Sequence, residues 1–130
     1  MLELWQAAES IPSVTDTPEA LELVLQRDDD LLLVAECDGR IVGTVMGGWD
    51  GWRGNIYRLA VLPEYRERGV ARALVRIIEG LLFELGADKI SATLEKDEPS
   101  GLPFWEAMGD SGYEPDNRFL RFTKNRPSGI

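Results

Sequence analysis

Apolar positions recur along this chain with a helical spacing in some stretches and with a strand-like density in others. The clearest helical pattern covers residues 70–85, where apolar side chains return every three or four positions, as on a helix that lies on a sheet. Gly86 follows and is suited to end this helix. Shorter patterns over residues 2–10 and after Thr17-Pro18 predict two N-terminal helices, with Thr17 as the N-cap of the second.

Three strands are predicted between the early helices and the long one. Residues 31–37 and 40–46 are mostly apolar, and Asp38-Gly39 between them is typical of a tight hairpin turn because glycine accepts a positive φ. Residues 47–54 contain four glycines and two tryptophans, and we interpret them as an exposed loop. Residues 55–62 are expected to form the third strand.

The part of the chain after the long helix predicts a parallel return strand and a closing hairpin. Residues 90–94 are expected to pair in parallel with the third strand, which would make a right-handed crossover. Residues 103–108 predict a short helix, and residues 113–115 and 119–123 predict a last pair of strands. The prediction is an α+β fold in one domain, residues 1–130, with a mixed, mostly antiparallel sheet and helices on both faces.

Composition and charge narrow the class of protein. The net charge is −9, with 23 acidic and 14 basic residues and no basic run, so nucleic acid and anionic membrane are poor candidates as partners. No run approaches the length of a membrane span and no signal pattern opens the chain, so we expect a cytoplasmic protein. Because the sequence has no histidine, imidazole-based zinc sites and Ser–His or Cys–His pairs are excluded, and we expect no metal. Cys37 is interpreted as a small core residue.

The segment between the third strand and the long helix carries the most specific chemistry. A helix N-terminus presents unpaired N–H groups and partial positive charge, and Gly69 and Ala71 let a backbone approach a diphosphate closely. Arg66, Arg68 and Arg72 add charge whose geometry suits phosphate oxygens. The segment lacks the Lys-Ser/Thr of a Walker A motif and the spaced glycines of a dinucleotide fold. We predict a phosphate-binding loop; the alternative is a tight helix start flanked by solvated arginines.

With its flanks, this segment resembles the signature of the GNAT superfamily of acetyl-CoA-dependent N-acetyltransferases. The signature is Arg/Gln-x-x-Gly-x-Gly/Ala after a strand that ends in an apolar-Val-x-Pro segment, and here it is Leu59-Ala60-Val61-Leu62-Pro63 and then Arg66-Glu67-Arg68-Gly69-Val70-Ala71. The likeness extends over about residues 31–123. Residues 43–54 resemble the YpeA-like bacterial branch, and the whole pattern is similar to the ribosomal-protein N-terminal acetyltransferases.

The resemblance implies direct transfer of an acetyl group from acetyl-CoA to an amine, carried by a small molecule or by a protein N-terminus or lysine. Backbone groups at a strand bulge would meet the acetyl group and the pantetheine arm, where the third and fourth strands splay. The N–H groups from Glu67 to Arg72 would hold the pyrophosphate. The implied cofactor-binding residues are Leu59, Ala60, Val61, Arg66, Glu67, Arg68, Gly69, Val70, Ala71 and Arg72.

Three positions depart from the family's catalytic pattern. Trp105 stands where many relatives carry a tyrosine general acid, and an indole N–H does not supply a proton at a usable pKa. Glu98 replaces a cofactor-holding asparagine, and Thr93 replaces the glutamate base of the ribosomal-protein enzymes. These departures leave a second function open, a non-catalytic module that binds or senses acyl-CoA. A structural domain that has lost the ligand is a third.

The remaining candidates for the general base are Asp50, on the glycine-rich stretch, and Glu95, after the fourth strand. For each, the alternative is a solvated surface acid. Trp49 and Trp52 either wall an acceptor pocket or cover a sheet edge.

These folds normally open with a strand, whereas the helical pattern here begins at Met1. Either the chain is truncated or the sheet lacks its first strand. A bare sheet edge is normally covered, so we predict a homodimer. A monomer in light scattering at micromolar concentration would contradict this prediction.

Overall fold

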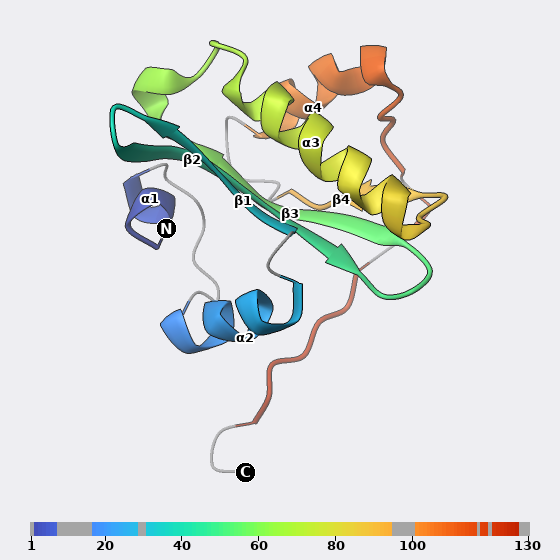
Figure 1. Ribbon diagram of the computed structural model, residues 1–130. Helices are drawn as coiled ribbons and strands as arrows, with labels where there is room; N and C mark the ends of the chain where they lie inside the picture. Colours follow the sequence, from blue (N-terminus) through green and yellow to red (C-terminus); the bar gives the residue numbers. More distant parts are fainter. Residues whose placement is uncertain are drawn as a thin grey trace. The chain divides into compact units, whose positions relative to one another are not determined.

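The computed structural model describes residues 2–7, 17–28, 31–94, 101–116, 118–119 and 121–127. Its internal contacts divide the chain into two compact units, Met1–Glu95 and Lys96–Ile130. The first unit contains a sheet with helices, and the second contains short helices followed by extended chain (Figure 1). No helix in the described ranges combines the length and the apolar character needed to cross a membrane.

A four-stranded sheet with the order β1-β2-β3-β4 is the centre of the first unit. The strands are β1 (Leu32–Cys37), β2 (Arg40–Trp49), β3 (Gly54–Val61) and β4 (Ile90–Ala92). The first three pair antiparallel, and β3 pairs with β4 in parallel. Asp38 and Gly39 have φ angles of 52° and 76°, which confirms the tight turn between β1 and β2. The predicted mixed, mostly antiparallel sheet is confirmed.

Glycines on β2 and β3 let helix α3 (Val70–Leu85) lie close to one face of the sheet. A Cβ atom at Gly47 would lie 2.9 Å from both Cγ1 and Cδ1 of Ile78, and Cβ atoms at Gly43 and Gly54 would each lie 3.1 Å from another side chain of α3. The helix ends at Gly86, whose φ of 115° requires glycine. The boundaries of α3 agree with the sequence pattern because burial on the sheet selects one apolar stripe.

Two shorter helices, α1 (Leu2–Ala7) and α2 (Pro18–Asp28), pack on the opposite face. Thr17 caps α2, since its Oγ1 accepts a hydrogen bond from a backbone N–H of the first turn at 3.1 Å. Trp5 on α1 is buried and donates a hydrogen bond to Thr44 on β2. Helices therefore cover both faces of the sheet, as predicted (Figure 1).

The prediction of an exposed loop over residues 47–54 is wrong for most of that stretch. Strand β2 continues through Trp49, β3 begins at Gly54, and only residues 50–53 form the turn. Gly47 and Gly54 are glycines because α3 packs directly on them, and not because a loop needs flexibility.

The predicted closing hairpin of residues 113–115 and 119–123 is also wrong, since the described residues of that stretch contain no strand. The second unit has helix α4 (Gly101–Ala107) and the short 3-10 helix η3 (Met108–Ser111). After them, the carboxylate of Asp116 accepts hydrogen bonds from the backbone and the guanidinium of Arg118 at 2.9–3.2 Å. This local pairing, which also raises the pKa of Arg118, competes with a strand ladder.

Candidate functional site

A β-bulge interrupts β3 near its C-terminal end. The register between β2 and β3 shifts by one residue between Thr44 and Met46, so Arg58 and Leu59 both lie opposite Val45. Arg58 has a φ of 49°, a left-handed conformation that costs a non-glycine residue about 1–2 kcal/mol. This end of β3 therefore has the bulge that the family resemblance implies.

A buried threonine supports the bulge from the neighbouring strand. The Oγ1 hydroxyl of Thr44 donates a hydrogen bond to the Arg58 carbonyl at 3.2 Å and accepts one from Trp5 Nε1 at 2.9 Å. Thr44 is completely buried. The guanidinium carbon of Arg58 also lies 5.0 Å from the centroid of the Trp5 ring. These contacts offset the conformational cost of Arg58.

The pairing of β4 with β3 ends just before the bulge. β4 pairs with Gly54, Asn55 and Ile56 only, and the last hydrogen bond runs from the Thr93 N–H to the Ile56 carbonyl at 3.4 Å. Within the described residues, the edge of β3 that faces away from β2 has no strand partner beyond Ile56. From Tyr57 onward, this edge therefore has no described strand that would compete with a ligand for it.

The turn that leads from β3 into α3 leaves the start of the helix open. Glu67 and Gly69 both have left-handed φ angles, 63° and 83°. The first turn of α3 contains no acidic residue. Among the described residues, no side chain caps the helix, and apart from the neighbouring residues and the helix backbone no atom lies within 4 Å of a Cβ built at Gly69. The first N–H groups of α3 and the space beside Gly69 therefore suit a diphosphate.

Arginine side chains hold this turn and make it cationic. Arg66 Nε donates a hydrogen bond to the Val61 carbonyl at 3.1 Å, which ties the loop to the end of β3. The guanidinium carbon of Arg68 lies 5.3 Å from the centroid of the Tyr65 ring, and Arg72 lies in the first turn of α3. Residues 59–72, which we call the strand–loop–helix segment, thus combine an open strand edge, a helix N-terminus and three arginines.

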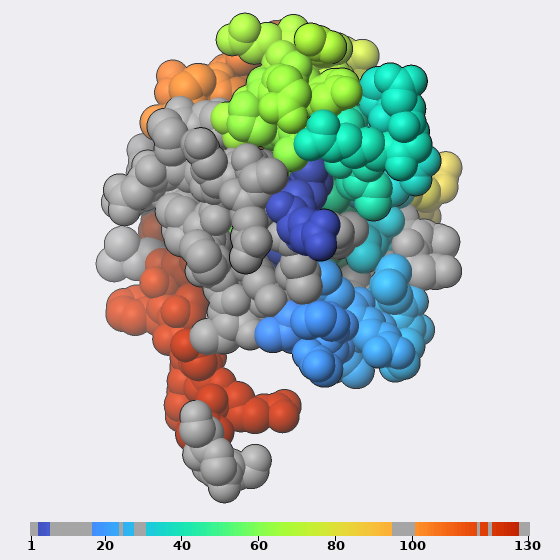
Figure 2. Space-filling model, turned by 90° about the vertical axis from the view of Figure 1, so that its left-hand side faces the viewer, coloured from blue at the N-terminus to red at the C-terminus, as the bar shows by residue number. Residues whose placement is uncertain are grey.

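The 3-10 helix η2 (Pro63–Tyr65) lies beside the β1–β2 hairpin. Arg40 of the hairpin and Glu64 of η2 form an exposed ion pair at 3.7 Å, and Figure 2 shows the two segments on one face (teal and yellow-green). The pKa of Tyr65 is raised, chiefly by its hydrogen bond with Cys37. Cys37, interpreted from the sequence as a small core residue, is only partly buried and packs, like Tyr65, against the side of a buried core cluster.

Comparison with known proteins decides which family this geometry represents. The model of the acetyltransferase (GNAT) family matches residues 1–110. The chain belongs to the GNAT acetyltransferase family. An acetyltransferase of Pectobacterium atrosepticum is 38% identical over 108 residues, which are 83% of this chain and 77% of that protein. The predictions of GNAT membership and of an N-acetyltransferase enzyme are confirmed.

Solved structures share the GNAT fold at low sequence identity. A structure of a Staphylococcus aureus protein named a probable acetyltransferase has a TM-score of 0.71 at 17% identity, covering 97% of this chain and 90% of that one. A structure of AAC(6')-Iy in complex with the bisubstrate analogue CoA-S-monomethyl-acetylneamine has a TM-score of 0.66 at 21% identity, covering 96% and 92%. These likenesses confirm the predicted α+β fold.

The structure brings together the ten residues predicted to bind the cofactor, because all of them lie on the strand–loop–helix segment. It does not bring Asp50 to them. Asp50 lies in the β2–β3 turn, where its N–H faces the Arg53 carbonyl at 3.5 Å, and Ala60 lies at the other end of β3. At about 3.3 Å per residue, the distance along the strand is roughly 20 Å. Glu95 lies outside the described residues.

Asp50 has a structural task where it is. Its Oδ1 accepts hydrogen bonds from the backbone N–H groups of Arg53 at 2.7 Å and of Trp52 at 2.8 Å. These bonds, that from Arg53 first, lower the pKa of the Asp50 carboxyl. A carboxylate with a lowered pKa is a weaker base, so Asp50 is better suited to hold the turn than to accept a proton.

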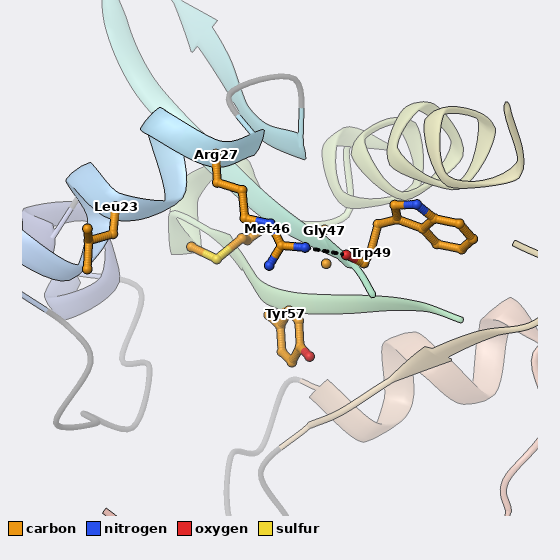
Figure 3. Close-up of a pocket in the computed structure, with 7 residues that line it drawn as sticks. Leu23, Arg27, Met46, Gly47, Trp49 and Tyr57 are labelled. Carbon is orange, nitrogen blue, oxygen red and sulfur yellow. Dashed lines mark hydrogen bonds between the residues drawn. The ribbon is translucent and has the colours of Figure 1, made fainter. Parts of the chain in front are cut away.

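The two tryptophans of the glycine-rich stretch have different surroundings. Trp52 is exposed, with the guanidinium carbon of Arg53 at 4.1 Å from its ring centroid. Trp49 borders an open cavity of about 310 Å³ between α2 and the strands β2 and β3, but its indole extends away from Tyr57 (Figure 3). Its carbonyl accepts a hydrogen bond from Arg27 at 3.1 Å. The other lining residues are Leu23, Met46, Gly47, Gly48 and Tyr57.

In the second unit, the departure at position 105 is part of an aromatic cluster. The ring of Trp105 meets those of Phe104 and Tyr113 edge to face, with centroids 5.2 and 5.0 Å apart. The indole at this position therefore packs against its neighbours. Within the described residues, no group of three or more metal-binding side chains comes together.

Proposed function

We propose that this GNAT protein transfers the acetyl group of acetyl-CoA directly to a primary amine. The observation that carries this proposal is the uncapped start of α3, reached through Glu67 and Gly69 in left-handed conformations and lined by Arg66, Arg68 and Arg72. Backbone N–H groups and the helix dipole would bind the pyrophosphate of the donor. A structure of AAC(6')-Iy in complex with CoA, at 20% identity, supports acetyl-CoA as the donor.

The pantetheine arm would then lie along the open edge of β3, from Tyr57 to Val61. The Leu59 N–H at the bulge would donate a hydrogen bond to the thioester carbonyl oxygen, where it would stabilise the charge that develops as the amine attacks. The amine nitrogen forms a bond to the carbonyl carbon, the carbon–sulfur bond breaks, and the thiolate of CoA leaves. The amine loses one proton and the thiolate gains one.

For these two proton transfers we propose water as the carrier. Asp50 lies far from the bulge along β3 and has a lowered pKa, and Trp105 has no suitable proton. A thiolate is a good leaving group, so the reaction depends less on a strong general acid than amide cleavage does. The rate should then rise with pH through the pKa of the acceptor amine, because only the neutral amine attacks.

The acceptor is proposed to be a small amine with an apolar body that enters through the cavity of Figure 3. The cavity includes Tyr57, which stands where β4 stops pairing with β3, two residues before Leu59. Its lining also contains Met46 and Leu23. The net charge of −9 favours the approach of cationic molecules. A peptide N-terminus or a lysine remains the alternative acceptor.

A panel of amines assayed for CoA thiol release, together with calorimetric titration of CoA, tests the function. Transfer to at least one amine is the expected result. Tyr57→Ala should raise the KM for that amine and leave the KM for acetyl-CoA unchanged, with Phe83→Ala, exposed on α3 and outside the cavity lining, as the control.

CoA binding without turnover for any amine would favour the second candidate, a non-catalytic acyl-CoA-binding module, which Trp105 suggests. Absence of CoA binding would overturn both functions.

A further inference from the structure

Trp5 and Thr44 form a buried relay that ends on the backbone of the bulge. The indole N–H of Trp5 donates to Thr44 Oγ1 at 2.9 Å, and this hydroxyl donates to the Arg58 carbonyl at 3.2 Å. Thr44 is 0% exposed and Trp5 is 3% exposed. Neither group has a place in the proposed chemistry, and both lie far in sequence from the residues they act on.

The geometry of the peptide bond gives this relay a consequence. The Arg58 carbonyl and the Leu59 N–H belong to the same planar trans peptide, so they point in opposite directions. Because Thr44 holds the carbonyl, it also holds the Leu59 N–H in the direction away from Thr44. Leu59 lies beyond Ile56, the last residue of β3 that pairs with β4, on the stretch of β3 whose outer edge has no described strand partner.

A left-handed arginine would not hold this peptide orientation by itself. The φ of 49° at Arg58 is unfavourable for a residue with a side chain, and the peptide that follows could rotate toward a more common geometry. Trp5 acts on Arg58 in two ways. Its N–H bonds to the Thr44 hydroxyl that holds the Arg58 carbonyl, and its ring centroid lies 5.0 Å from the Arg58 guanidinium carbon. The relay therefore opposes a rotation of the Arg58–Leu59 peptide.

We propose that Trp5 and Thr44 are positioning residues, which aim the Leu59 N–H at the thioester carbonyl of the donor. This inference rests on the proposed function. It extends the active site to helix α1, whose Leu4 and Trp5 pack in one core cluster with Ala60 and Leu62. The aim of the bulge then depends on the relay hydroxyl, whereas pyrophosphate binding depends on the start of α3.

The variant that tests the relay is Thr44→Val, which removes the hydroxyl and keeps the shape of a β-branched side chain. We expect kcat to fall by about ten-fold or more, because the donor N–H is no longer held, while the KM for acetyl-CoA and the Kd for CoA change less than two-fold. Thr44→Ser, which keeps the hydroxyl, should retain most of kcat. Trp5→Phe should give an intermediate loss.

A matched control separates positioning from general destabilisation. Ile78→Val removes one methyl group from the core under α3, on the opposite face of the sheet, and should lower the thermal midpoint without lowering kcat. A fall in kcat for Ile78→Val as large as that for Thr44→Val would overturn the inference, because the loss would then follow from stability alone.

A second readout does not depend on the acceptor. Infrared difference spectra of bound acetyl-CoA, labelled with carbon-13 at the thioester carbonyl, report the polarisation of that bond. We expect a red-shifted band in the native protein and in Thr44→Ser, and a return toward the free value in Thr44→Val. A band that Thr44→Val leaves unchanged would overturn the relay alone. A native protein that does not bind acetyl-CoA in calorimetry would overturn the proposed function, and the relay's role with it.

Discussion

The two ends of strand β3 differ in what holds them and in what they offer to a ligand. At its N-terminal end, the turn of residues 50–53 is exposed and is held by one carboxylate, that of Asp50, on two backbone N–H groups. At its C-terminal end, a bulge with a left-handed arginine is held by a buried hydroxyl, and an uncapped helix start follows.

This difference indicates which end of β3 is better suited to bind a ligand. The turn carries the more conspicuous residues, with an acid, two tryptophans nearby and glycines, but its carboxylate accepts hydrogen bonds from the turn's own backbone. The bulge end leaves backbone donors open and stabilises an unfavourable conformation with buried partners. We therefore assign ligand binding to the C-terminal end and structural work to the N-terminal end.

The largest expected effect of a single change is on CoA affinity, at the C-terminal end. Gly69→Asp places a negative charge at the start of α3, where the pyrophosphate would bind, and aspartate tolerates a left-handed φ better than most residues. We expect the Kd for CoA in calorimetry to rise by about 100-fold or more, or roughly 2.7 kcal/mol. Gly80→Asp, the same change in open space on α3, is the matched control and should leave the Kd unchanged.

The next effect is on stability, in the part of the sheet between the two ends. Gly47→Ala puts a Cβ atom 2.9 Å from the fully buried Ile78 side chain, so the free energy of unfolding should fall by about 1–3 kcal/mol in urea titration. The double variant Gly47→Ala/Ile78→Ala should lose less unfolding free energy than the sum of the two single losses, because the Ile78 Cγ1 and Cδ1 atoms that would clash are gone. Additive losses would show that the glycine is not needed for the approach of α3.

A smaller effect is expected in the second unit. Trp105→Phe should change kcat less than two-fold, because phenylalanine keeps much of the aromatic packing with Phe104 and Tyr113 and the indole has no proton task. Steady-state kinetics with the best amine of the panel measures this. A ten-fold or larger loss of kcat, at unchanged KM for acetyl-CoA, would show that position 105 takes part in the chemistry. It would contradict the assignment of the chemistry to β3 alone.

The smallest effect on activity is expected at the N-terminal turn. Asp50→Ala should lower the thermal midpoint by a few degrees and leave kcat unchanged, while Asp50→Asn, which keeps an oxygen acceptor, should restore most of the loss. The pKa of Asp50 is lowered from 3.8 in the folded state, so its stabilising contribution is present above 3.8 and is lost as the pH falls through the folded pKa. The difference in thermal midpoint between the native protein and Asp50→Ala should therefore narrow below pH 3.8.

Local signals in the sequence predicted the parts of the fold that depend on local physics. The Asp38-Gly39 turn, the Thr17 cap and the helix Val70–Leu85 all follow from short-range preferences and from one buried stripe. Local preferences in the sequence did not predict the role of Gly47. A glycine beneath a helix and a glycine in a loop are identical in sequence, and only the approach of α3 distinguishes them.

The candidate site likewise has one part that the sequence predicted and one part that it did not. The strand–loop–helix segment is continuous in sequence, so its phosphate-binding pattern was visible as a motif. The relay of Trp5, Thr44 and Arg58 joins residues 39 and 14 positions apart, and its key feature is a positive φ on an arginine, which no local pattern indicates. The candidate base Asp50 shows the same limit, because it is close to β3 in sequence but lies at the opposite end of the strand from the bulge.

The most direct test of the central assignment is a two-dimensional proton–nitrogen NMR titration of the protein with CoA. We expect the largest amide shifts at Glu67–Arg72 and Leu59–Val61, with amides of the turn at residues 50–53 almost unchanged. Shifts centred on residues 50–53, with residues 59–72 unaffected, would contradict it.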